Sequence, residues 1–277
     1  MTIKKTLKDA YDGVVDRYWA GSKNEVGSMR NAGFALKHFG ENTYLYEITA
    51  EKINNYVKVL VENGNSNATV NRKLAAISKL LRYAYNMEWI PRVPTIIKNK
   101  ESKNRIRYLS HDEEAKLVAT FISMNRQDLA NLCIFLVDTG CRVGEALRLE
   151  WRDIVDGAKA TFWDTKNGES RTIPLTSRVK KLIEEIKGHG DARPFGNISQ
   201  SSFNHAWNEA RGLMNLSHDK EFVPHSLRHT CASRLVQAGI PILTVKEYLG
   251  HKTIQITMRY AHLSATQLVD AASVLEK

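Results

Sequence analysis

Six residues in the second half of the chain have the side-chain types that chemistry at a phosphodiester needs. An arginine can bind two phosphate oxygens in parallel and stays charged at any working pH. Histidine and lysine can move protons, and a tyrosine offers a phenol oxygen as a nucleophile. The six residues are Arg142, Lys166, His225, Arg228, His251 and Tyr260. Together they predict metal-free transfer of a phosphoryl group to a phenol oxygen.

Arg142 stands at a corner between two predicted helices. The apolar stretch at residues 129–139 is predicted to be a helix that Gly140 ends, and Arg142 opens the next helix. The unpaired N–H groups at the start of a helix favour an anion, so this corner suits a phosphate. We expect Glu145 to brace the corner rather than to take part in the chemistry. An arginine beside a glycine corner is commonly structural, which is the alternative for Arg142 taken alone.

Lys166 comes directly before Asn167-Gly168, the strongest short hairpin signal in the chain. The flanking stretches, residues 158–165 and 170–174, are predicted to be the two strands. A long side chain on such a rigid ribbon can enter a DNA groove and donate a proton to a departing 5′ oxygen. Taken alone, a lysine at a turn is usually exposed to solvent, and that alternative stands beside the catalytic one.

His225 and Arg228 are three residues apart in a predicted helix, so their side chains share one face. Pro224, just before them, suits the first turn of that helix. A competing interpretation is a zinc site, because His225 and His229 are four residues apart, as in helical zinc pairs. No glutamate follows the first histidine, however, and the sequence has no other dense group of metal ligands. We therefore expect His229 to pack or to position a neighbour.

His251 follows Leu249-Gly250, where the glycine is predicted to end a helix and to turn the next side chain aside. We expect His251 to orient a phosphate oxygen or to assist proton movement. Tyr260, nine residues further on, is the candidate nucleophile. A phenol has a pKa of about 10 in water, so attack at neutral pH needs cationic neighbours and a base. The alternative is a core tyrosine of an amphipathic helix.

The first part of the chain is predicted to be helical. Apolar residues recur there with helical spacing, and breaks rich in glycine and asparagine separate the periodic stretches. The predicted helices are residues 7–18, 26–39, 53–61 and 70–85. This pattern predicts a four-helix N-terminal domain.

Pro91 and Pro94 end this helical region, and a second domain begins at Leu109. Ser110 is a predicted helix N-cap, with acidic residues in the first turn behind it. Further helices are predicted at residues 178–186, 201–214, 227–238, 242–248 and 254–260, and a short amphipathic tail helix at 264–275. The chain is therefore expected to be mainly α-helical, with one small antiparallel β-sheet in the second domain.

The net charge of the chain is +10, and its first part carries most of it. Residues 1–104 hold 17 Lys and Arg against 10 Asp and Glu. A basic domain is compatible with a polyanionic partner, most simply nucleic acid. The fourth predicted helix alternates an apolar stripe with Arg72, Lys73 and Lys79, which we expect to contact DNA phosphates or the major groove. The alternative is a solvated face on a bundle helix.

Residues 98–107 have the composition of a linker, since five cations and one acid stand there without an apolar period. We expect its cations to lie along a DNA duplex, so that two basic modules can close around it. These cations include Lys98, Lys100, Lys103 and Arg105. A merely soluble tether is the alternative. The predicted boundaries are residues 1–97 for the first domain, 98–107 for the linker and 108–277 for the second domain.

The composition argues against several other classes of protein. A chain of 277 residues with 43% hydrophobic content is long enough for two ordinary cores. Its apolar stretches are short and interrupted by charge, which argues against a membrane span, and no apolar run follows the first lysines, which argues against a secretory signal. The three cysteines, Cys133, Cys141 and Cys231, are expected to be buried reduced thiols of a cytoplasmic protein.

Four motifs occur in order along the second domain: Thr139-Gly140-Cys141-Arg142-Val143-Gly144-Glu145, His225-Ser226-Leu227-Arg228-His229-Thr230, Leu249-Gly250-His251 and Arg259-Tyr260-Ala261-His262. In this order and spacing they resemble the active site of the tyrosine recombinases, the phage integrase family. The resemblance implies that Tyr260 forms a 3′-phosphotyrosyl bond and releases a 5′-hydroxyl. It also implies phosphate-binding roles for the arginines and histidines, and a general acid at Lys166. No cofactor, metal or ATP is then needed, because the phosphotyrosine keeps the bond energy.

The resemblance covers almost the whole chain. Residues 107–265 look like the catalytic domain of the family, and residues 1–90 look like its helical core-binding domain. This implies a homo-tetramer on specific double-stranded DNA sites at the nucleoid, with an accessory DNA-bending protein and a tail helix that docks on a neighbouring protomer. Because the chain starts directly in the core-binding helices, we expect a compact two-domain member from a phage or another mobile element. The alternatives are a DNA-binding protein of this fold without catalysis, and a type IB topoisomerase.

Overall fold

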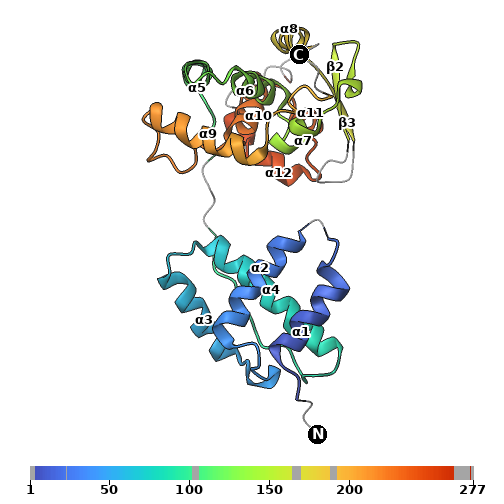
Figure 1. Cartoon of the computed structure of the whole chain (residues 1–277), viewed down its shortest axis with the longest axis vertical. Helices are drawn as coiled ribbons and strands as arrows, with labels where there is room; N and C mark the ends of the chain where they lie inside the picture. Colours follow the sequence, from blue (N-terminus) through green and yellow to red (C-terminus); the bar gives the residue numbers. More distant parts are fainter. Residues whose placement is uncertain are drawn as a thin grey trace. The chain divides into compact units, whose positions relative to one another are not determined.

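The chain divides into two compact units, Met1–Asn104 and Arg105–Lys277, each with a hydrophobic core of its own (Figure 1). The structure is a computed structural model, and it describes residues 4–22, 24–101, 106–163, 170–187, 192–264 and 275. Among these residues, no helix combines the length and the apolar character that a membrane crossing requires.

The first unit is a bundle of α-helices. Its described residues form α1 (Leu7–Val14), α2 (Glu25–Phe39), α3 (Ala50–Glu62) and α4 (Asn67–Asn86), with a π-helical turn at Val15–Trp19 and a 3-10 turn at Leu45–Glu47. The helices surround α4, whose Leu74, Ile77 and Leu81 are fully buried. The predicted four-helix arrangement is confirmed. The π-helical turn replaces the last turn of the first predicted helix, a local change of winding that apolar spacing does not reveal.

The second unit is mostly helical. Its described residues form α5 (His111–Ser123), α6 (Gln127–Thr139), α7 (Val143–Arg148), α8 (Ser177–Ile186), α9 (Gln200–Leu213), α10 (His225–Gln237), α11 (Ile242–Leu249) and α12 (Ile254–Met258), with 3-10 turns at Trp151–Asp153 and Ala261–Leu263. The apolar α6 is the central element, and it contacts α5, α7, α8 and α10. A capping box between Ser110 and Glu113 starts α5, which confirms the predicted N-cap.

One small antiparallel sheet lies at the edge of this unit (Figure 1). Its strands are β1 (Ile154–Val155), β2 (Lys159–Phe162) and β3 (Arg171–Pro174), in the order β1-β2-β3. Phe162 pairs with Arg171 where the β2–β3 ladder ends. The predicted small sheet is confirmed, with an additional two-residue strand, β1, that the sequence pattern did not indicate. The predicted hairpin turn at Asn167-Gly168 lies outside the described residues.

Glycines end the two helices that lead into the candidate site. Gly140 follows α6 with a φ of +59°, and Gly250 follows α11 with a φ of +66°. A Cβ atom at Gly140 would stand 2.6 Å from Leu249 Cδ2, and one at Gly250 would stand 2.8 Å from Arg171 Cδ. Only glycine fits both the backbone conformation and the available space. Each helix therefore ends at its glycine, and the residues that follow it lie in the site.

The three cysteines are buried and unpaired, as predicted. The predicted tail helix at residues 264–275 lies outside the described residues, except for Ser264 and Leu275.

Candidate active site

Five of the six predicted catalytic residues come from different stretches of the second unit that meet at one place. Arg142 caps the start of α7, His225 and Arg228 lie on α10, His251 follows α11, and Tyr260 follows α12. Figure 1 shows α7, α11 and α12 gathered beside α10, and contacts join α10 to α11 and α11 to α12. The packing of short helices therefore brings together residues that are more than a hundred positions apart in the sequence.

Arg228 is the most deeply buried cation of this group, with 2% of its surface exposed. Its Nη1 donates to the Gly140 carbonyl at 2.6 Å, and its Nη2 donates to the Leu249 carbonyl at 2.7 Å. These carbonyls lie at the ends of α6 and α11, where helix dipoles favour a cation. Burial, together with the charges of Arg142 and Arg171, lowers the pKa of Arg228 to about 10. The guanidinium is therefore held rigidly by neutral partners, and its positive charge stays available to an anion.

Glu145 holds two other arginines in place. Its buried carboxylate accepts from Arg142 Nη1 at 2.7 Å, from the Arg142 backbone N–H at 3.0 Å and from Arg171 Nη2 at 2.7 Å. Burial alone would raise the pKa of Glu145, but hydrogen bonds and charge from Arg171 and hydrogen bonds from Arg142 bring the pKa down to about 2. The carboxylate is therefore ionised and fixes the direction of both guanidinium groups.

The charges of this group do not balance. Arg142, Arg171 and Arg228 contribute three positive charges, and Glu145 contributes one negative charge, which leaves an excess of two. A phosphodiester carries one negative charge, and more charge builds on its oxygens when a fifth ligand approaches phosphorus. A low-dielectric site with a fixed positive excess is suited to hold that charge.

His251 lies within the field of the same arginines. It is 7% exposed, and its Nδ1 is 2.9 Å from Thr257 Oγ1 on α12. Burial first, and then the charges of Arg228 and Arg142, lower the pKa of His251 to about 3. The imidazole is therefore neutral at physiological pH, with its ring orientation fixed by a buried hydroxyl.

Tyr260 has an apolar ring environment and a polar contact at its oxygen. The residue is 2% exposed and packs with Val236, Val245 and Leu249. Its hydroxyl lies 2.5 Å from His229 Nδ1. Burial raises the pKa of Tyr260, while the charges of Arg259 and Arg228 act in the opposite direction. The phenol is thus protonated at neutral pH, and its oxygen points to polar groups rather than into the apolar core.

The two histidines of α10 are in contact with each other. His225 is exposed, and its ring meets the ring of His229 edge to face at a centroid distance of 4.8 Å. Within the described part of the chain, no group of three or more His, Cys, Asp or Glu residues is arranged to hold a metal ion. His225 therefore contacts His229, and His229 in turn contacts the Tyr260 hydroxyl.

Lys166, the sixth predicted residue, lies in the 164–169 segment, outside the described residues. The two strands that this segment joins are described, and β3 contacts α11. Its general-acid role stays a prediction.

Two residues of the site were not given roles in the chemistry by the sequence patterns. Arg171 donates to Glu145, and its guanidinium lies 4.8 Å from the centre of the Phe162 ring. It shares the inward face of β3 with buried Ile173, so a cation on the apolar face of a predicted strand was the available signal. His229 contacts the Tyr260 hydroxyl, and no spacing rule connects residues 229 and 260.

The residues of α4 that were predicted to contact DNA differ in exposure. Arg72 is exposed and Lys79 is half-buried, with its Nζ 3.6 Å from the centre of the Tyr18 ring. Lys73 differs from the prediction: it is 5% exposed, donates to Asn65 Oδ1 at 3.0 Å and lies 3.7 Å from the centre of the Phe34 ring. Its ammonium group therefore contacts Asn65 and Phe34 within the first unit and is not exposed to a phosphate.

The predicted linker is partly attached to the first unit. The Asn99 backbone exchanges hydrogen bonds of 2.9 Å with the Asn71 side chain, and the Lys100 carbonyl accepts from Asn67 at 2.8 Å. The side chains of Lys98 and Lys100 are exposed along this stretch. Lys103 and Arg105 lie outside the described residues.

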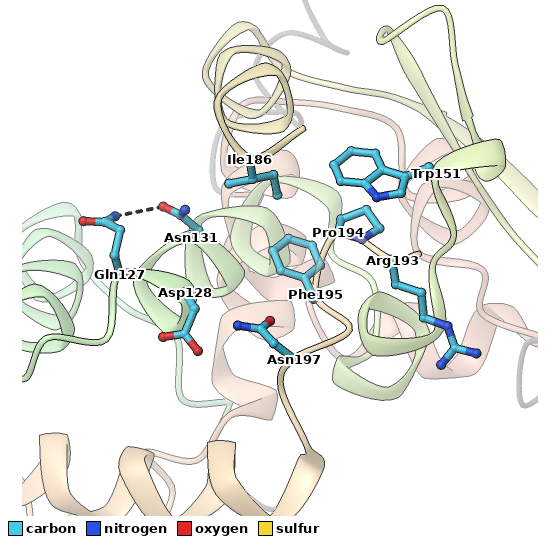
Figure 2. Close-up of a pocket in the computed structure, with 9 residues that line it drawn as sticks. All are labelled: Gln127, Asp128, Asn131, Trp151, Ile186, Arg193, Pro194, Phe195 and Asn197. Atoms are coloured by element: carbon cyan, nitrogen blue, oxygen red, sulfur yellow. Dashed lines mark hydrogen bonds between the residues drawn. The ribbon is translucent and has the colours of Figure 1, made fainter. Parts of the chain in front are cut away.

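A separate pocket of about 260 Å³ lies at the other end of α6 (Figure 2). Figure 2 shows Trp151, Pro194 and Phe195 on one side of it, and Gln127 and Asn131 of α6 on the other. Gln127 Nε2 donates a hydrogen bond of 2.9 Å to Asn131 Oδ1. The 13 residues of α6 span roughly 20 Å at 1.5 Å per residue, and the Arg142 corner follows its far end. The pocket is therefore not part of the arginine site.

Comparison with known proteins identifies relatives along the whole described chain. Residues 107–267 match the phage integrase family, and residues 6–104 match the phage integrase SAM-like domain. The chain is 29% identical to an integrase of Escherichia phage P2 over 232 residues, which is 83% of this chain and 65% of that protein. It spans about half to two thirds of the length of the first curated relatives it matches.

Solved structures share the fold. A lambda integrase dimer bound to a COC′ core site matches with a TM-score of 0.80 and 22% identity, over 93% of this chain and 77% of that one. A lambda integrase tetramer bound to a Holliday junction matches with a TM-score of 0.78 and 21% identity, over 93% and 77%. The likeness therefore extends through both units. With a family match over residues 107–267 and this fold, the chain belongs to the phage integrase family.

Proposed function

We propose that the chain is a site-specific DNA recombinase, an integrase that cleaves and rejoins DNA strands through a 3′-phosphotyrosine intermediate without metal or ATP. Its task would be the integration and excision of a phage genome or another mobile element. The observation that carries the proposal is the buried Arg228 guanidinium. It is held by two carbonyls beside Arg142 and His251, and among the described residues no carboxylate is hydrogen-bonded to it, so it suits a bound phosphate.

In the proposed reaction, Arg142 and Arg228 bind the non-bridging oxygens of the scissile phosphate, and His225 and His251 orient it. The Tyr260 oxygen passes its proton to water and forms a bond to phosphorus, and the bond from phosphorus to the 5′ oxygen breaks. Lys166 donates a proton to that departing oxygen. Rejoining runs the same steps in reverse, with a 5′-hydroxyl from another strand as the attacking group. No external energy source is required, because one phosphoester replaces another.

The role of Glu145 and Arg171 in this scheme is to prepare the site. Glu145 fixes Arg142 before DNA arrives, so the guanidinium needs little reorganisation when charge builds on the phosphate. Arg171 supplies the second partner of Glu145, which keeps the carboxylate ionised and the net charge of the site positive.

The proposed DNA-contacting residues are cations of the first unit and of the stretch behind it. They are Arg72, Lys79, Lys98 and Lys100, together with Lys103 and Arg105. Lys73 is left out of this set because its ammonium group is buried against Phe34 and Asn65. Cations that neutralise phosphates provide affinity through counterion release and little sequence information.

The proposed assembly is a homo-tetramer on two specific double-stranded DNA sites, with an accessory DNA-bending protein as a further partner. It is supported by family membership and by the fold shared with an integrase whose tetramer is bound to a Holliday junction. Such an enzyme would work at the nucleoid, in the cytoplasm of a bacterial cell.

A nicked DNA substrate tests the proposed function. Its sequence is taken from the DNA that flanks the gene, and the nick lets the short 5′-hydroxyl fragment leave after cleavage. We expect wild-type protein to accumulate a covalent protein–DNA adduct, and Tyr260→Phe to bind the same DNA without forming one. Tyr108→Phe is the matched control, because it removes a phenol oxygen with a 3.2 Å contact to Gln237 elsewhere in the unit.

The outcomes of this assay separate the candidate functions. Binding by wild-type protein without any adduct would indicate a DNA-binding protein that has lost catalysis. Relaxation of supercoiled plasmid that lacks the specific site would indicate a topoisomerase. Equal adduct from wild type and Tyr260→Phe would remove Tyr260 from the reaction.

A further inference from the structure

The hydroxyl of the candidate nucleophile has a hydrogen-bond partner outside the six predicted catalytic residues. Tyr260 Oη lies 2.5 Å from His229 Nδ1, and the two rings are 5.8 Å apart at an angle of 50°. His229 lies on α10, one residue after the buried Arg228. The contact therefore joins the turn that carries Tyr260 to the helix that carries a phosphate-binding arginine.

The environment of this hydrogen bond sets the protonation of both partners. Burial first, and then the charges of His225, Arg259 and Arg228, lower the pKa of His229 to about 3. Burial raises the pKa of Tyr260. At neutral pH the phenol therefore keeps its proton and the imidazole is neutral, and of its two tautomers we assign the one in which the phenol donates and Nδ1 accepts. The imidazole must then carry its own proton on Nε2.

Among the described residues, the groups whose charges lower the pKa of His229 are cationic or able to become so. His225 and Arg228 come from α10 itself, and Arg259 comes from the end of α12. A protonated His229 would meet repulsion from both elements, so the ring stays a neutral acceptor over the physiological range. The edge-to-face contact with His225 adds a second constraint on the ring orientation.

Tyr260 needs such a restraint because its local backbone supplies little. It follows α12, a helix of only five residues, and precedes a 3-10 turn of three. Without a polar partner, a phenol oxygen in the apolar pocket of Val236, Val245 and Leu249 would have no preferred direction. A displacement of about 1 Å in a reacting group can lower a rate about a hundredfold.

We propose that His229 is a positioning residue for the nucleophile, which holds the Tyr260 hydroxyl toward the arginine site by accepting its proton in a hydrogen bond. This role rests on the proposed function, since it concerns the oxygen that attacks phosphorus. His229 acts through Tyr260 and has no contact with the phosphate in this scheme. The bond is made before DNA binds and is released when the phenol gives up its proton.

The kinetic test compares three variants in the nicked-substrate assay. His229→Ala removes the acceptor, and we expect adduct formation to slow about a hundredfold while DNA binding stays unchanged. His229→Asn places an oxygen at the same distance along the side chain as Nδ1, and we expect it to recover most of the rate, to within about tenfold of wild type. His205→Ala, at an exposed position on α9, is the matched control and should match wild type.

Rescue by asparagine distinguishes positioning from a purely structural role, because both variants remove the imidazole ring. The pH dependence of the adduct rate in His229→Asn should run parallel to that of wild type. Equal rates for the alanine variant and wild type, or equal losses in the alanine and asparagine variants, would overturn the proposal. Failure of wild type itself to form an adduct would instead refute the proposed function.

An NMR measurement tests the contact without relying on activity. In protein labelled with ¹⁵N-histidine, His229 should appear as the neutral tautomer with its proton on Nε2. Its Nδ1 resonance should move in Tyr260→Phe, while the His205 resonances stay in place. A His229 proton on Nδ1, or an Nδ1 signal that ignores the Tyr260 substitution, would overturn the proposal.

Discussion

Burial of ionisable side chains gives the site an excess of positive charge and makes it sensitive to acid. The arginines keep their charge when buried, because carbonyls and one carboxylate support them. The histidines lose theirs, because burial first, and then nearby cationic groups, lower the pKa values of His229 and His251 to about 3. Burial and the positive field that would stabilise a phosphate therefore act together to keep both imidazoles neutral.

A pH dependence of folding follows from His251. Its pKa is about 3 when folded and about 6.5 in an unfolded chain, so the unfolded state binds the extra proton between these values. The free energy of unfolding should therefore fall as the pH is lowered from about 6.5 toward 3. Glu145, with a folded pKa of about 2, adds to this loss below about pH 4.5.

The measurement is urea unfolding of wild type and His251→Gln across this pH range, without DNA. The variant removes one titrating group. The slope of its free energy of unfolding against pH should therefore be smaller than that of wild type by up to about 1.4 kcal/mol per pH unit. His205→Gln, at an exposed site, should keep the wild-type slope. Parallel curves for wild type and His251→Gln would mean that His251 is not held neutral in the folded protein.

At the scale of elements, much of the fold follows from local sequence signals. Apolar spacing predicted α2, α4 and α9 to within a few residues, because each buries one continuous stripe. Local caps predicted the start of α5 and the end of α6. β1 was not predicted, since a two-residue strand has no periodicity of its own and exists only through its pairing with β2. Arg171 was missed for a related reason, because its role depends on Glu145 of another element.

The two glycine helix ends provide a prediction at this scale. Gly140→Ala should destabilise the second unit by backbone strain of about 1–2 kcal/mol, and by about 1–3 kcal/mol more for overpacking against Leu249 and Cys231. Gly239→Ala is the matched control: its φ is +78°, and a Cβ there meets nothing within 4 Å. Gly239→Ala should lower the free energy of unfolding only by the contribution from backbone strain. The difference is measured by chemical unfolding, and equal losses would contradict the packing described around Gly140.

At the scale of the whole molecule, charge and motif order pointed to DNA, but neither could specify individual contacts. The basic character of residues 1–104 predicted a polyanionic partner. It could not reveal that Lys73 is buried, because that depends on Phe34 from α2 lying across it. The convergence of Arg142 and His251 on Arg228 is likewise a property of tertiary packing. The sequence order of the motifs suggested it only through their resemblance to a known family.

The central claim is that phosphorus passes to the Tyr260 oxygen, and peptide mapping of the trapped adduct tests it most directly. Trypsin cuts after Arg259, so Tyr260 becomes the first residue of the C-terminal peptide, which ends at Lys277. After nuclease and trypsin digestion, mass spectrometry should find a nucleotide joined through its 3′-phosphate to Tyr260 in that peptide. A nucleotide on any other residue, with Tyr260 unmodified, would contradict the account.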